Sequence, residues 1–89
     1  MKENKKLEEI KKQVEQQIGM LLNDTTVPRN VKNALEEAKK ALGEDKDEYT
    51  VRFSNAIYKI DEVSNDINLS PYARSIIWNI LSLLESGKE

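Results

Sequence analysis

The sequence predicts an all-α fold of four antiparallel helices arranged as two helical hairpins. Apolar residues recur at steps of three and four in four separate segments, which is the spacing of one face of a helix. No segment alternates apolar and polar residues as a half-buried strand does. The stretches between the segments are short, about three to six residues, so successive helices must run in opposite directions. With 89 residues the chain has the size of one domain, and we expect a single domain over 1–89.

The first two helices are expected at about 4–22 and 28–42. The apolar stripe of the first helix consists of Leu7, Ile10, Val14, Ile18 and Leu21. Gly19 is unusual within it, because Ala there would favour the helix by about 1 kcal/mol, and a close approach of another helix would explain it. Pro28 suits the first position of the second helix, where a missing N–H costs nothing. Gly43 suits the residue that ends it.

The third helix is expected at about 46–64. Asp45 and Glu48 stand three residues apart at its start, which is the spacing of a capping box with reciprocal side-chain and backbone bonds. Its apolar face consists of Tyr49, Phe53, Ala56, Ile57, Ile60 and Val63. A helix with one apolar face packs that face on its neighbours.

The fourth helix is expected at about 71–86. Ser70 can accept a hydrogen bond from an otherwise unpaired N–H at its start, and Pro71 suits the first helical position. Gly87 is expected just past its end. The predicted core of the four helices consists of Leu7, Ile10, Val14, Ile18, Leu21, Val31, Leu35, Ala38, Leu42, Phe53, Ile57, Ile60, Ala73, Ile76, Ile77, Ile80 and Leu84.

The two predicted hairpins align with each other when the chain is shifted by 42 residues. Asp24 then falls on Asp66 and Val27 on Leu69, and the apolar phase of the helices that follow agrees. A period of 42 residues lies in the range of HEAT and armadillo repeats, whose helical pairs cannot bury their apolar faces alone. Two hairpins of equal length also agree in phase through helical periodicity alone. The fold is therefore either an up-and-down four-helix bundle or a HEAT-like pair of hairpins.

Two short segments resemble a known family. Residues 24–32 read Asp-Thr-Thr-Val-Pro-Arg-Asn-Val-Lys, and residues 74–78 read Arg-Ser-Ile-Ile-Trp. Together they resemble uncharacterised protein family 0147, a group of small archaeal proteins, and the likeness covers nearly the whole chain. This resemblance implies an archaeal cytosolic protein with a four-helix fold. Because that family has no established activity, the resemblance implies no catalytic or binding residue.

The chain lacks the residue types on which most enzymes depend. It contains no histidine and no cysteine, so the commonest general base, the thiol nucleophile and the usual zinc ligands are missing. Its three glycines are isolated and form no phosphate-binding loop. Its glutamates interleave with lysines, as on a solvated helix face. We expect no catalytic residue, no metal and no cofactor, and we predict that the protein is not an enzyme.

Neither a membrane anchor nor a signal peptide is indicated by the hydropathy pattern. The longest nearly apolar run, residues 76–84, has about half of the length that a membrane-spanning helix needs. The N-terminus is basic but leads directly into an amphipathic pattern. We therefore expect a cytoplasmic protein that does not bind membranes.

Basic residues at the start of the first helix raise the possibility of nucleic-acid binding. The cluster contains Lys2, Lys5, Lys6, Lys11 and Lys12. Acids follow each basic pair, and the whole chain has a net charge of −2 and a pI of about 5.3. Such a surface releases few counterions from phosphates, so nucleic acid is not the expected partner. A weak nucleic-acid or ribonucleoprotein accessory role, using these lysines with Arg29 and Lys32, is the alternative function.

The leading hypothesis is a non-enzymatic protein-protein interaction module that binds an unidentified protein or a second copy of itself. Arg74, Trp78 and Leu81 share an edge of the fourth helix outside its apolar stripe, and Trp and Arg are favoured interface anchors. The structural alternative is a tryptophan at the core margin covered by Arg74, which could also stack on Trp78. Asp24 and Arg29 flank the first turn and are further candidates. Their structural alternative is to cap helices and bridge connectors.

Overall fold

The computed structural model describes residues 2–88, which form four helices. They are α1 (Lys2–Leu22), α2 (Arg29–Leu42), α3 (Tyr49–Asp61) and α4 (Pro71–Lys88). Residues 2–88 contain no strand, so the prediction of an all-α fold with four helices is confirmed. The predicted domain, 1–89, also includes the two terminal residues, which lie outside the described part of the chain.

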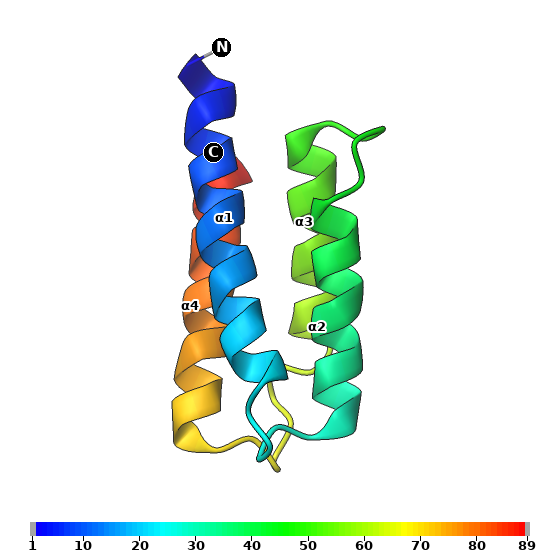
Figure 1. Ribbon diagram of the computed structural model, residues 1–89, viewed down its shortest axis with the longest axis vertical. Coiled ribbons are helices and arrows are strands. Elements are labelled where there is room, and N and C mark those ends of the chain that lie inside the picture. The colour runs from blue at the N-terminus through cyan, green and yellow to red at the C-terminus, as the bar shows by residue number, and fades with distance from the viewer. Residues whose placement is uncertain (1, 89) are drawn as a thin grey trace.

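The four helices enclose one common core. In Figure 1, α1 runs downward from the N-terminus, α2 upward, α3 downward and α4 upward. Each helix packs on two neighbours, because α1 contacts both α2 and α4, and α3 contacts the same two helices. The molecule measures 40 × 20 × 20 Å. The α1–α2 and α3–α4 connectors lie at its lower end and the α2–α3 connector at its upper end (Figure 1). Within residues 2–88, no helix is both long enough and apolar enough to cross a bilayer.

The core contains most of the residues predicted for it, together with residues from the connectors. Leu7, Ile57 and Ile76 are only partly buried, and the other predicted core residues are buried. Val27 and Leu69 were not predicted, but each is buried from a connector at the lower end. These two side chains close that end of the core.

The start of α3 differs from the prediction, because the Asp45 and Glu48 capping box is not formed. Glu48 itself is the residue before the helix, and its side chain makes no capping bond. Asp45 instead lies near Arg52, with 3.7 Å between Oδ1 and Nη2. Arg52 Nε donates to the Asp47 carbonyl oxygen at 2.8 Å, so the residues before Tyr49 are held as a connector.

The ends of α3 and α4 also differ from the prediction. α3 ends at Asp61, where Ser64 turns back and donates its hydroxyl to the Asp61 carbonyl oxygen at 3.0 Å. α4 continues to Lys88, so Gly87 lies inside the helix. Gly87 is buried against the ring of Phe53, which leaves no room for a side chain there.

The start of α4 is capped as predicted, and the start of α2 has the same arrangement of backbone bonds around Pro28. Ser70 Oγ accepts a hydrogen bond from the Ala73 N–H at 3.1 Å. Pro28 occupies the same place before α2, since Lys32 N–H donates to its carbonyl oxygen as Arg74 N–H donates to that of Ser70. Pro28 is therefore the residue before the helix and not its first residue. Pro28 and Ser70 are 42 residues apart and occupy equivalent positions, so the alignment of the two hairpins holds for these two residues.

Candidate functional site

Trp78 and Leu81, both predicted on an exposed edge of α4, differ in burial. Trp78 is 51% exposed and remains available for contact. Leu81 is 7% exposed and belongs to the core, so its prediction as a contact residue is wrong. The reason is its position four residues after Ile77 and three before Leu84, which places it beside two fully buried side chains.

Arg74 binds a connector rather than the ring of Trp78. Its Nη2 donates to the Asp66 carbonyl oxygen at 3.2 Å. In the described part of the chain, the cation–π contact is instead that of Arg52 with Tyr49, where the guanidinium carbon lies 4.7 Å from the ring centroid. The predicted stacking of Arg74 on Trp78 is therefore not formed, and the exposed indole is left to other contacts.

Asp24 and Asp66 each stabilise a connector at the lower end. Asp24 Oδ1 accepts from the hydroxyl of Thr26 at 2.6 Å and from its N–H at 2.8 Å, and these bonds lower the pKa of Asp24. Asp66 accepts from Asn30 Nδ2 and from the Asn68 N–H, both at 2.8 Å, and these bonds lower the pKa of Asp66. Since Asn30 belongs to α2, its bond ties α2 to the α3–α4 connector. These contacts fit the structural alternative for Asp24.

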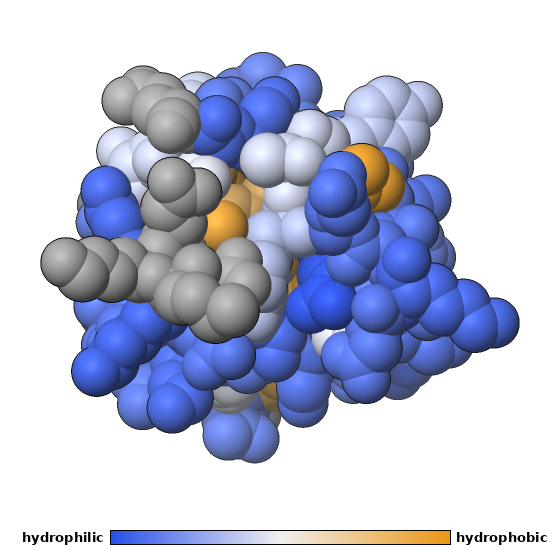
Figure 2. Space-filling view, turned by 90° about the horizontal axis from the view of Figure 1, so that it is seen from above, coloured by the Kyte–Doolittle hydropathy of each residue, from blue (hydrophilic) through white to orange (hydrophobic). Residues whose placement is uncertain are grey.

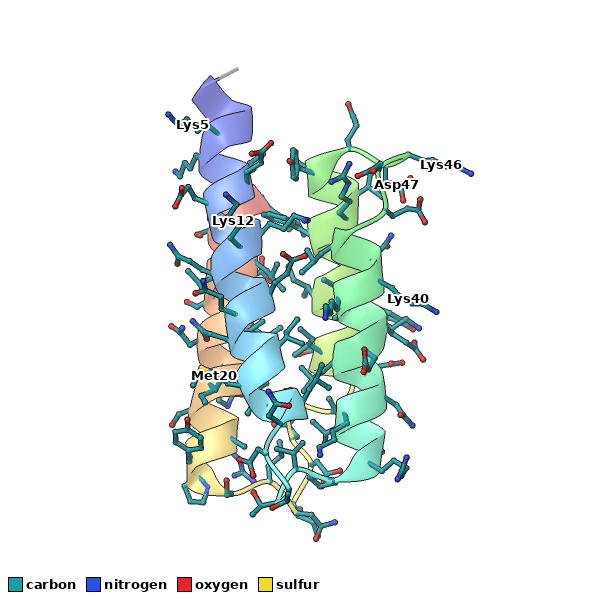
Figure 3. All side chains as sticks on the ribbon, viewed as in Figure 1. Lys5, Lys12, Met20, Lys40, Lys46 and Asp47 are labelled. Atoms are coloured by element: carbon teal, nitrogen blue, oxygen red, sulfur yellow. The ribbon has the colours of Figure 1, made fainter. Side chains whose placement is uncertain are left out.

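The alternative function, nucleic-acid binding, would use Arg29 together with the lysines at the start of α1, but Arg29 lies far from them. It is exposed at the start of α2, where it lines a hollow of about 480 Å³ together with Lys32. Lys5 and Lys12 lie in the upper part of α1 (Figure 3). From Lys12 to Leu22 at its lower end, α1 is about 15 Å long. The structure thus does not bring the two basic groups together.

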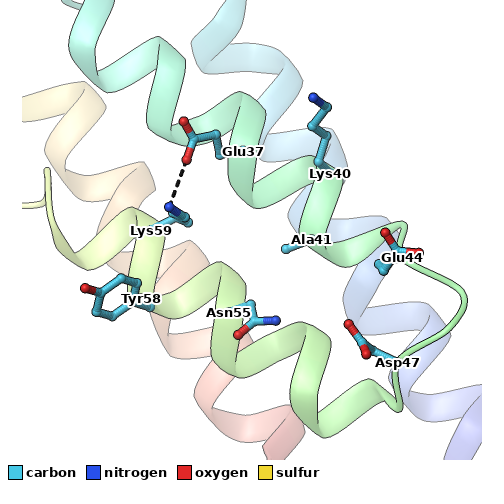
Figure 4. A pocket seen from close by; sticks show the side chains of 8 residues that line it. All are labelled: Glu37, Lys40, Ala41, Glu44, Asp47, Asn55, Tyr58 and Lys59. Atoms are coloured by element: carbon cyan, nitrogen blue, oxygen red, sulfur yellow. Dashed lines mark ion pairs between the residues drawn. The ribbon is translucent and has the colours of Figure 1, made fainter.

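An open groove of about 410 Å³ lies between α2 and α3. It is lined by Glu37, Lys40, Ala41, Glu44, Asp47, Asn55, Tyr58 and Lys59. Lys59 Nζ lies 3.0 Å from Glu37 Oε1 (Figure 4), and the hydrogen bond that Lys59 donates to Glu37 raises the pKa of Lys59. Over residues 2–88, no three acidic, histidine or cysteine side chains are placed to hold a metal ion. The groove mixes both signs of charge and converges on no single ligand position.

One stretch of α1 and one stretch of α4 carry no charged residue. Residues 16–23 and 75–84 contain no Asp, Glu, Lys or Arg, although 34% of the chain is charged. Asn79 Nδ2 donates to Gln17 Oε1 at 2.9 Å, and this bond places the two stretches side by side. We define the uncharged face by the exposed residues of the α4 stretch, which are Ser75, Trp78, Asn79 and Ser82.

Three large side chains of α1 and α4 are exposed. Met20 is 51% exposed, Tyr72 58% and Trp78 51%. Figure 3 places Met20 in the lower part of α1, away from Lys5 and Lys12. The upper end of the molecule is mostly hydrophilic by contrast, with small apolar areas (Figure 2).

Sequence reasoning singled out Trp78 as a candidate contact residue but did not single out Met20 or Tyr72. The available signal is the absence of charge from residues 16–23 and 75–84. Each stretch alone looks like the apolar half of an amphipathic helix. That the two stretches lie side by side becomes evident only once α1 and α4 are seen to pack together.

Comparison with known proteins gives relatives over most of the chain. A model of Uncharacterised protein family (UPF0147) matches residues 1–86. The chain is similar to the UPF0147 protein of Methanocaldococcus jannaschii, with 46% identity over 81 residues, covering 91% of this chain and 87% of the relative. The UPF0147 protein of Pyrococcus horikoshii is 39% identical over 83 residues, with 89% of each chain covered. The crystal structure of "unknown function protein MMP1188" is similar with a TM-score of 0.78 and 38% identity, covering 91% of this chain and 88% of that one.

Proposed function

Because this chain belongs to the uncharacterised protein family UPF0147, which has no assigned activity, we propose from its own surface that it is a non-enzymatic module that binds another protein through the uncharged face. The observation that carries this proposal is the half-exposed indole of Trp78 on the uncharged face, within a stretch of α4 that has no charged residue. The centres of protein interfaces are depleted in charged residues and enriched in aromatic residues and Met.

The energetics of burial support this role for the uncharged face. Burying a large apolar side chain completely is worth about 1.5–3 kcal/mol, and a half-exposed one gives about half of that. Trp78 offers such a contribution on the uncharged face, and Met20 and Tyr72 are two further large exposed side chains of α1 and α4. A partner that covers the uncharged face need not desolvate an ionised group at the centre of the contact, which would oppose binding.

The distribution of perturbed side chains supports a non-enzymatic role. Asp24 and Asp66 have lowered pKa values because of hydrogen bonds within the connectors, and Lys59 has a raised pKa because of its bond with Glu37. Asp24 and Asp66 lie in connectors at the lower end, whereas Lys59 lines the groove between α2 and α3, to which neither aspartate contributes. Catalytic sites gather perturbed groups around a reacting atom.

Substitution of Trp78 tests the proposal, with Tyr58 as a matched control. Trp78→Lys places a cation on the uncharged face, whereas Tyr58→Lys places one at an exposed aromatic residue in the groove between α2 and α3. Each tagged variant is incubated with an extract of the cells that express the protein, and retained proteins are quantified by mass spectrometry. We expect proteins, or further copies of this chain, that wild type and Tyr58→Lys retain and that Trp78→Lys loses about tenfold or more. Equal retention by all three proteins would contradict the proposal.

A further inference from the structure

We infer that the partner of the uncharged face is a second copy of this chain, bound so that the two α4 helices cross antiparallel about a two-fold axis. This assignment rests on the proposed function, because it names the protein that the uncharged face binds. Three features of α4 favour a second copy: the placement of its charges, the sizes of its exposed side chains and the chemistry of the polar groups around Trp78.

The charges that bracket Trp78 are complementary to themselves under a two-fold axis. Arg74 lies four residues before Trp78 and Glu85 seven residues after it, so the three share one line along the helix. Arg74 and Glu85 are exposed. A two-fold axis reverses the direction of the second α4, so Arg74 of each copy faces Glu85 of the other. One surface therefore supplies both members of two ion pairs.

The exposed side chains of α4 alternate between large and small. Ser75 lies three residues before Trp78 and Ser82 four residues after it, and both serines are exposed. Because their side chains are short, the two serines leave a shallow groove beside the projecting indole. A ridge on one helix packs into such a groove on another, so the indole of each copy can lie over the two serines of the other.

The polar groups near Trp78 suit a copy of the same face. Ser75, Asn79 and Ser82 each carry both a donor and an acceptor, so each can pair with an identical group. Residues 75–84 contain no ion for a strongly charged partner to neutralise. A second copy of this chain offers identical polar groups for pairing and an equally uncharged centre, so it matches this face.

Charge reversal tests this assignment on the purified full-length chain. Wild type, Arg74→Glu, Glu85→Arg and the double reversal are compared by sedimentation equilibrium from about 1 to 500 µM, a range that covers moderate affinities. We expect wild type to form a dimer and each single reversal to raise the dissociation constant about tenfold or more, because two ion pairs become two repulsions. The double reversal should restore the wild-type constant to within about threefold, because each pair is re-formed with its signs exchanged.

Trp78 reports on the same contact, since it is the only tryptophan in the chain. Its emission should shift to shorter wavelength as the wild-type protein is concentrated, and the single reversals should need about tenfold higher concentration for the same shift. Circular dichroism and thermal unfolding check the fold of each variant, and Glu85→Arg leaves the bond between Arg74 and Asp66 intact.

A wild-type protein that is monomeric throughout, or a double reversal as weak as the single reversals, would overturn the two-fold dimer. If the monomeric protein still retains another protein from extract in a manner that depends on Trp78, the proposed function stands and only the second copy is wrong. If both measurements fail, both proposals fall.

Discussion

At the scale of single residues, Gly19 shows how an unusual residue can lack a packing role. A Cβ built at Gly19 meets nothing within 4 Å, so the close helix approach expected from the sequence is not present. Gly19→Ala should therefore stabilise the protein by about 0.5–1 kcal/mol, through the lower entropy of the unfolded chain and a better helix propensity. Urea unfolding measures the change. A variant less stable than wild type would contradict the open space seen around Gly19.

Gly87 is the opposite case, because its missing side chain makes room for an aromatic ring. A Cβ at Gly87 would lie 2.6 Å from Cδ2 of Phe53, which is fully buried and cannot swing into solvent. Gly87→Ala should cost about 1–3 kcal/mol through overpacking. The exposed neighbour Ser86 provides the control, since Ser86→Ala should change the free energy of unfolding by less than about 0.5 kcal/mol. Equal stability of Gly87→Ala and wild type would show that this contact is loose.

Asp66 predicts a dependence of stability on pH. Its pKa is lowered from the ordinary value of 3.8, first by the bond from Asn30 and then by the Asn68 N–H. A carboxyl group with a lowered native pKa stabilises the fold above its unfolded pKa, and this contribution is lost as the pH falls through the native value.

Thermal unfolding of wild type and Asp66→Asn between about pH 6 and pH 2 measures this loss. We expect wild type to lose stability below about pH 4 and Asp66→Asn to lose less, because residue 66 no longer titrates. Parallel curves for the two proteins would rule out a stabilising role for the ionised Asp66.

At the scale of elements, the three connectors share one pattern of backbone hydrogen bonds. In the first connector, the Asp24 N–H donates to the carbonyl oxygen of Leu21, and the Val27 N–H donates to the carbonyl oxygen of Asp24. The same pair of bonds recurs at Glu44 and Asp47, and again at Asp66 and Leu69. The two lower connectors place an apolar residue at the last of these positions and bury it. The upper connector has Asp47 there, whose carbonyl oxygen accepts from Arg52 instead.

This pattern predicts different costs for two apolar residues of one connector. Leu69 is buried in the core, whereas Ile67 is 89% exposed. Leu69→Ala should destabilise the protein by about 2–4 kcal/mol, because it leaves a cavity at the lower end of the core. Ile67→Ala should cost less than about 0.5 kcal/mol. Similar costs in urea unfolding would mean that the α3–α4 connector does not close the core.

The helices themselves could be predicted from the sequence because apolar periodicity records which face is buried. Their ends could not be predicted as well, because connectors are fixed by contacts between residues that compete with helix capping. Arg52 is the clearest example: its bond with the Asp47 carbonyl oxygen holds a connector where Asp45 and Glu48 suggested a helix. Gly87 is another, since glycine suggests a helix end and here provides space for Phe53.

At the scale of the whole molecule, the candidate site depends on which helices are neighbours. The sequence indicated Trp78 as a candidate contact residue, and it placed Leu81 wrongly because the width of the buried face depends on two neighbouring helices. It could not indicate that residues 16–23 lie beside residues 75–84, because the packing of α1 on α4 brings together residues about 60 positions apart. Which helices are neighbours is a property of the tertiary fold.

Photo-cross-linking from position 78 in living cells tests most directly whether the uncharged face is a recognition surface. A photoreactive phenylalanine replaces Trp78 in one full-length protein and Tyr58, which is 65% exposed in α3, in another. We predict a discrete covalent adduct from position 78 and little adduct from position 58, and an adduct of twice the chain's mass would identify a second copy as the partner. Equal yields from the two positions, or no adduct from position 78, would contradict the assignment of this face to protein binding.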